Sequence, residues 1–96
     1  MGTYIGLINY TSQGIANIRD TPKRSEDFAA SVEALGVEVK DVYWTMGAHD
    51  GVLIFSAPDD EAATAAMLSL GARGMAQAQT LRAFDRTEME RILGKL

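Results

Sequence analysis

The sequence predicts an α+β fold built on a single antiparallel sheet. Strand-like runs alternate with helix-like segments in the order β-α-β-β-α-β, and a short final helix follows. Residues 37–45 and 51–57 are strand-like runs separated by a short polar break that contains glycine, which is typical of a β-hairpin. This order is the split βαβ pattern of the ferredoxin-like fold, in which both helices lie on one face of a four-stranded sheet.

Composition distinguishes the predicted strands from one another. Residues 3–10 are rich in β-branched and aromatic side chains. Residues 51–57 contain a continuous apolar run bounded by Gly and Pro, which is typical of a strand buried on both faces. Residues 75–84 are less apolar, so this strand is expected at an edge of the sheet.

The strand at 37–45 is expected to alternate strictly between its two faces. Val39 and Tyr43 would then share one face of the sheet, while Val42 and Trp44 would share the other.

Local signals mark where the first two helical segments begin and end. Thr11 or Ser12 is expected to cap a short helical turn after the first strand. Thr21 then supplies a capping hydroxyl before Pro22 at the first helical position. Gly36 is expected to end this longer helix.

The later helices carry similar signals. Asp59 is the expected cap of the second long helix, which should end at Gly71 or Gly74. Thr87 and Glu90 have the spacing of a capping box, so they are expected to open the final short helix.

Length and charge restrict the classes of protein that remain. At 96 residues, the chain has room for one domain, 1–96, and one core. A net charge of −4 argues against nucleic-acid binding, and no run is apolar for the roughly 18 residues that a membrane span needs. The absence of cysteine and of a leader-like segment favours the cytoplasm. One histidine and no cysteine predict no metal site, and no cofactor is predicted.

The apolar strands predict self-association. The strands at 3–10 and 51–57 are apolar on both sides, but two helices cover only one face of the sheet. The uncovered face must therefore meet another surface, and a second copy of the chain is the simplest partner. We predict a homodimer of the dimeric α/β-barrel type, formed through the sheet face.

His49 and Asp50, in the predicted hairpin turn, are the candidate catalytic residues. Histidine is the side chain whose ordinary pKa lies near neutrality, so His49 could act as a general acid or base or as a haem ligand. The alternative is that both residues stabilise the turn. We favour this structural interpretation, because adjacent side chains in an extended segment point in opposite directions.

Candidate ligand-binding residues are spread over several elements. Tyr10 and Trp44 could form an aromatic pocket together with Tyr43, although core and dimer packing would use the same residues. Thr11 and Gln13 offer polar groups beside the end of the first strand, where they could equally stabilise the turn.

Two cations, Lys23 and Arg24, fall in the first turn of the long helix, where the helix dipole disfavours positive charge. Either an anionic ligand or ion pairs with nearby acids would explain them, and ion pairing is the simpler explanation. The predicted ligand set combines residues from these elements with the candidate of the hairpin turn: Tyr10, Thr11, Gln13, Lys23, Trp44 and His49.

Three segments together resemble the GYD-domain family. They are the run Thr11-x-Gln13-Gly14-Ile15 leading to Asp20-Thr21-Pro22-Lys23-Arg24, the run 43–50, and Ala57-Pro58-Asp59-Asp60-Glu61. The resemblance covers nearly the whole chain, but His49 replaces the tyrosine of the signature that names the family. It implies a ferredoxin-like fold of the dimeric α/β-barrel type, and it implies no defined biochemical function.

Two hypotheses from different classes follow. The first is a small homo-oligomeric binding or structural module with a pocket between sheet and helices. The second is a small enzyme, cofactor-independent or haem-linked and similar to oxygenases or isomerases, that uses His49 and Asp50; it rests on fold analogy alone. An enzyme should lose activity on replacement of either residue, whereas a binding module should be stabilised by its ligand.

Overall fold

The computed structural model describes all 96 residues. Its elements are β1 (Gly2–Tyr10), α1 (Ser12–Ala16), a 3-10 turn (Ile18–Asp20), α2 (Thr21–Ser31), a second 3-10 turn (Glu33–Leu35), β2 (Glu38–Trp44), β3 (Gly51–Ala57), α3 (Asp60–Ala72), β4 (Ala76–Ala83) and α4 (Arg86–Leu93). The strands form one antiparallel sheet in the order β2-β3-β1-β4. The predicted α+β, ferredoxin-like fold is confirmed. None of the helices is both long and apolar enough to cross a bilayer.

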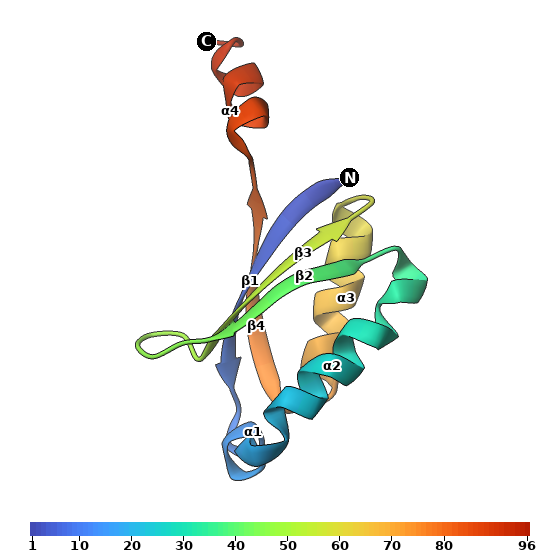
Figure 1. Cartoon of the computed structure of the whole chain (residues 1–96), viewed down its shortest axis with the longest axis vertical. Coiled ribbons are helices and arrows are strands. Elements are labelled where there is room, and N and C mark those ends of the chain that lie inside the picture. Colours follow the sequence, from blue (N-terminus) through green and yellow to red (C-terminus); the bar gives the residue numbers. More distant parts are fainter.

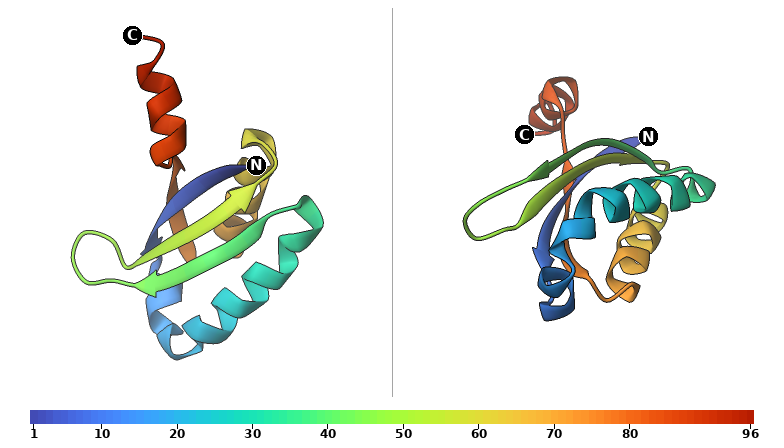
Figure 2. Two further views of the ribbon diagram at one scale, coloured as in Figure 1. Left: turned by 45° about the horizontal axis from the view of Figure 1, so that its top comes forward. Right: turned by 60° about the horizontal axis from the view of Figure 1, so that its bottom comes forward.

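The core lies between the sheet and the pair of helices α2 and α3, which cover the same face (Figure 1). The right-hand view of Figure 2 shows both helices on one side of the strands. Side chains from all these layers form the buried cluster: Tyr4, Phe28, Val32, Val37, Leu53, Phe55, Ala57, Ala63, Ala66 and Met67. The residues of β3 are alternately buried and half-buried along its whole length. One face of this strand therefore contributes side chains to the core.

Strand β2 departs from the alternation that its sequence predicts. The register shifts between Val39, which pairs with Phe55, and Asp41, which pairs with Ile54. Lys40 is the extra residue of this bulge, and each residue after it turns to the opposite face. Val39 and the later Val42 therefore both face the helices, and the expected grouping of Val39 with Tyr43 is wrong.

The helix starts follow their predicted signals at α1 and α3 but not at α2. Thr11 accepts the backbone N–H of Gly14 at 3.1 Å, and Asp59 accepts that of Ala62 at 2.8 Å. Thr21 does not cap α2: the 3-10 turn places Asp20 at that position, and Thr21 is the first helical residue. This leaves the Thr21 hydroxyl free to bond side chains outside its own helix.

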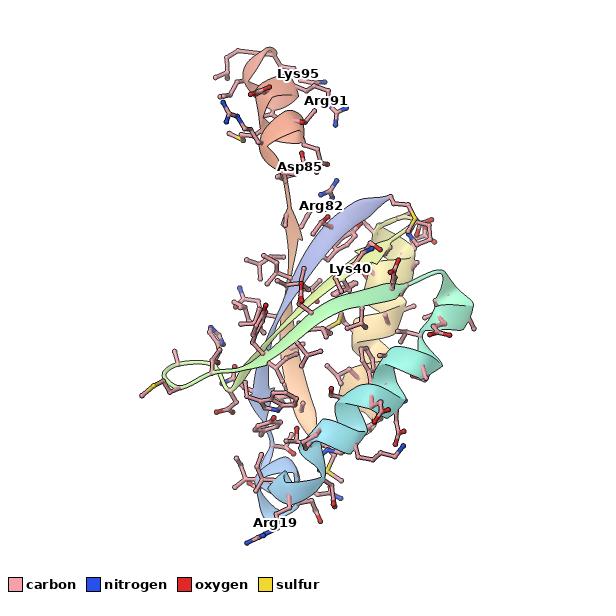
Figure 3. The ribbon with its side chains drawn as sticks, in the orientation of Figure 1. Arg19, Lys40, Arg82, Asp85, Arg91 and Lys95 are labelled. Atoms are coloured by element: carbon pink, nitrogen blue, oxygen red, sulfur yellow. The ribbon has the colours of Figure 1, made fainter.

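The final helix, α4, projects beyond the sheet, and none of its residues is buried (Figure 1). Its capping box is formed by Asp85 and Glu88, which precede the predicted pair Thr87 and Glu90 in the chain. Figure 3 shows Arg82 and Asp85 where β4 leads into this helix. Arg82 pairs with Glu88 at 2.8 Å, and this contact holds the pKa of Glu88 below its usual range.

Candidate functional site

An apolar cavity of about 90 Å³ lies between the sheet and the helices that cover it. Eleven of its sixteen lining residues are hydrophobic, among them Ile8, Phe28, Val42, Leu53 and Leu70. They come from several strands and from both covering helices, so the cavity exists only once the sheet and helices have packed together. The cavity opens to solvent on the side of Trp44, which is 48% exposed, so a small molecule could enter it from there.

Three element ends meet at a shared hydroxyl group beside the cavity. Tyr10 ends β1, Trp44 ends β2, and Thr21 begins α2. The Tyr10 hydroxyl lies 2.8 Å from Thr21 Oγ1, and the Trp44 indole N–H donates to the same oxygen over 3.3 Å. These contacts hold two aromatic rings against the start of the helix, and all three residues line the cavity.

Two guanidinium groups complete the lining. Arg24 comes from the first turn of α2, and Arg73 follows the end of α3. Arg24 donates to the backbone carbonyls of Asn17 at 2.6 Å and Gly14 at 3.5 Å. Neither arginine takes part in any of the four ion pairs of the chain. The cavity lining therefore contains two cations and no Asp or Glu.

The structure brings two of the predicted ligand-binding residues to the cavity, Tyr10 and Trp44. Thr11 caps α1 and donates to the Gly74 carbonyl at 2.7 Å, which ties α1 to the start of β4. Gln13 is exposed and outside the lining, and Lys23 pairs with Asp27 at 2.9 Å on the surface.

Tyr43, the third aromatic residue of the predicted pocket, sits directly opposite Val52 in the sheet register. Tyr43 belongs to the cavity lining, although strand alternation places its side chain on the face opposite to that of Trp44.

The two candidate catalytic residues tie the β2–β3 turn to β1. His49 Nδ1 lies 2.9 Å from Asn9 Oδ1, and the Asp50 carboxylate accepts the backbone N–H of Tyr10 at 2.9 Å. The backbone N–H of Asp50 also donates to the Ile8 carbonyl at 2.8 Å. Neither side chain lines the cavity, and they have separate partners, so their arrangement gives no support to the alternative enzyme hypothesis. That hypothesis stays a prediction.

The residues that sequence reasoning missed are Thr21, Phe28 and Arg73 as parts of one site. From its sequence neighbours, Thr21 is interpreted as a helix cap. Phe28 is interpreted in the same way as part of the apolar stripe along one side of a helix. Arg73 carries no local signal at all, because its role depends on α3 ending beside α2. No three His, Asp or Glu side chains are grouped so that they could hold a metal ion.

We expect the Thr21→Val variant to lose about 1–2 kcal/mol of unfolding free energy, because Tyr10 and Trp44 both lose their hydrogen-bond partner. The emission of the single tryptophan should also shift, since its indole N–H is released. Urea unfolding followed by tryptophan fluorescence measures both effects. The Thr21→Ser variant keeps the hydroxyl and should resemble the wild type; equal behaviour of the valine and serine variants would contradict the hydroxyl's role.

The comparisons with known proteins agree with this fold. The crystal structure of TTHA0845 from Thermus thermophilus is similar, with a TM-score of 0.55 and 23% sequence identity over 88% of this chain and 95% of that chain. This likeness concerns the fold alone. No curated protein matches the sequence. Residues 4–93 match the family described as the GYD domain. Because that match spans nearly the whole chain, the protein belongs to the GYD domain family.

Proposed function

We propose that the protein is a small homo-oligomeric module of the cytoplasm that binds a small molecule in the cavity between the sheet and α2. The observation that carries the proposal is the cavity itself, about 90 Å³ within a domain of 96 residues. The cavity is concave, opens to solvent beside Trp44 and has a mostly apolar lining with a few polar groups, which are the features of small-molecule sites in proteins. The Thr21 hydroxyl, which holds the Trp44 indole at the edge of the cavity, would orient the bound molecule.

The binding proposal is tested with isobutanol, a neutral probe small enough for the cavity. The indole N–H of Trp44 gives a single NMR signal next to the cavity, and it is expected to shift on titration. The Ala76→Leu variant fills the cavity from β4, and Leu70→Phe fills it from α3, so the shift should disappear in both. The proposal fails if isobutanol shifts the indole signal equally in the wild type and in the two filled variants, or in none of them.

The uncovered face of the sheet supports the self-association part of the proposal. Apolar side chains from all four strands form a continuous patch there, because strand register places them side by side: Ile5, Leu7, Tyr43, Val52, Ile54 and Leu81. Tyr43 is 57% exposed and Leu81 is 38% exposed in the single chain. The hydroxyl of Ser56 on the same face has no hydrogen-bond partner. A second copy related by two-fold symmetry would cover this patch with the same patch.

The Ile54→Lys variant is expected to become monomeric while keeping its fold. Ile54 is only half-buried in the single chain, but a symmetric sheet-to-sheet interface would bury two lysines without partners. The Ala30→Lys variant makes the same charge change on the exposed side of α2 and should keep the wild-type mass. Sedimentation equilibrium measures the mass. A monomeric wild type, or an Ile54→Lys variant with the wild-type mass, would contradict the proposed interface.

A further inference from the structure

We infer that the ligand of the cavity is a small carboxylate with a branched hydrocarbon chain of about four carbons, whose carboxylate is held by Arg24 and Arg73. This inference rests on the proposed binding function and adds the chemical class of the ligand. Three features carry it: the charge of the lining, the way each arginine is held, and the volume of the cavity.

The charge of the lining is opposite to that of the protein. The chain has 13 acidic and 9 basic residues and a net charge of −4. The cavity nevertheless has Arg24 and Arg73 in its lining and no carboxylate. The four ion pairs use Lys23, Lys40, Arg82 and Arg86, so these two guanidinium groups are not neutralised by the protein. An anionic ligand would supply the missing charge.

Arg24 occupies an unfavourable position for a cation. It lies in the first turn of α2, where the helix dipole is positive. The charge of its neighbour Lys23 is compensated by an ion pair with Asp27. Arg24 instead donates to the neutral carbonyls of Asn17 and Gly14. Those bonds restrain the guanidinium without cancelling its charge, and Arg24 itself lines the cavity. A group held in this way is preorganised for an anion.

Arg73 reaches the same cavity from the other helix. Its guanidinium lies 5.7 Å from the centre of the Phe28 ring, and one of its nitrogens donates to Ser31 Oγ at 2.8 Å. The end of α3 favours a cation, so Arg73 alone would require no ligand. Because Arg24 lines the same cavity, the lining carries two positive charges in place of one. A guanidinium has five N–H donors, so both arginines retain donors for a carboxylate.

The cavity volume sets the size of the apolar part. A cavity of about 150 Å³ lined by similar side chains accepts benzene, which has six carbons. The same ratio gives room for about four carbons in the 90 Å³ present here. Thr21 and Ser25 also belong to the lining, and their hydroxyls can donate hydrogen bonds to carboxylate oxygens. A branched acyl group joined to one carboxylate matches both the volume and the charge.

The test compares isovalerate with isovaleramide, which has the same hydrocarbon group and no charge. Dissociation constants are measured from the Trp44 indole signal in NMR titrations of the wild-type protein and three variants. Isovalerate is expected to bind at least tenfold more tightly than isovaleramide. Arg24→Met and Arg73→Met should each weaken isovalerate binding at least tenfold and leave isovaleramide binding unchanged. Arg19→Met is the matched control, because Arg19 is exposed and lies outside the cavity (Figure 3).

The outcomes separate this inference from the proposed function. Equal binding of isovalerate and isovaleramide would overturn the carboxylate inference and leave the binding proposal intact. A loss as large in Arg19→Met as in Arg24→Met would also overturn it, because general surface charge would then explain the preference. No binding of either compound, together with no response to isobutanol, would remove the binding proposal itself. If Arg24→Met fails to fold, Arg73→Met tests the same claim from the other helix.

Discussion

The Gly14→Ala variant is expected to lose about 3 kcal/mol of unfolding free energy, a large share of the roughly 5–15 kcal/mol that keeps a small domain folded. A methyl group at Gly14 would lie 2.0 Å from the backbone oxygen of Met75 and 3.0 Å from its carbonyl carbon. Backbone atoms cannot move aside as a flexible side chain can, so α1 would have to separate from the start of β4. Urea unfolding followed by circular dichroism measures the loss.

The Gly71→Ala variant is the matched control for Gly14→Ala. Gly71 lies in the last turn of α3, and an added methyl group would meet nothing within 4 Å. Alanine favours the helix over glycine by up to about 1 kcal/mol, so this variant should be as stable as the wild type or more so. Equal losses in the two variants would show that the chain requires glycine at position 14 for its backbone freedom and not because of the close approach to Met75.

The Phe28→Ala variant is expected to lose about 3–5 kcal/mol of unfolding free energy. Phe28 is only 3% exposed, it belongs to the core, and it also lines the cavity. Its removal merges the space of one aromatic ring with the existing cavity, so the surviving folded protein should accept benzene. Urea unfolding and NMR titration with benzene measure the two effects.

Phe84→Ala provides the comparison for Phe28→Ala. Phe84 also lies beneath an arginine, with the Arg82 guanidinium 4.7 Å from its ring centre, but it is 53% exposed. Its replacement should cost about 1 kcal/mol or less, since little buried area and one exposed cation–π contact are lost. Similar losses for the two phenylalanines would contradict the placement of Phe28 in the core.

Local sequence signals were sufficient for the fold. Caps such as Thr11 and Asp59 act on residues a few positions away, and strand alternation is likewise local. The bulge at Lys40 was not predictable, because it arises from the pairing of β2 with β3. The last capping box illustrates another limit: Asp85–Glu88 and Thr87–Glu90 have the same spacing, and the contact of Glu88 with Arg82 accompanies the pair that forms.

The candidate site was only partly predictable for the same reason. Tyr10 and Trp44 could be predicted as site residues because each combines a large apolar ring with a polar group that usually finds a hydrogen-bond partner. Thr21 could not, because its hydroxyl contacts residues 11 and 23 positions away while its sequence context indicates a helix cap. The sequence left two explanations for Arg24, an anionic ligand or an ion pair with a nearby acid. In the structure Arg24 has no acidic partner.

The exposed apolar side chains of α4 give further support to the proposed self-association. The helix projects from the single chain with Met89 44% and Leu93 51% exposed, so it adds apolar surface beyond the sheet (Figure 1). A homo-oligomer large enough to cover the sheet face could also cover this surface, whereas a monomer leaves both in water.

Crystals pressurised with xenon test the cavity most directly. Xenon enters dry apolar cavities and is located by its anomalous scattering, without any assumption about the natural ligand. We predict one strong xenon site between the sheet and α2, in contact with Ile8, Phe28 and Leu53. Absence of xenon from this position, with sites found only on the outer face of the sheet, would show that the cavity does not accept a ligand and would contradict the proposed function.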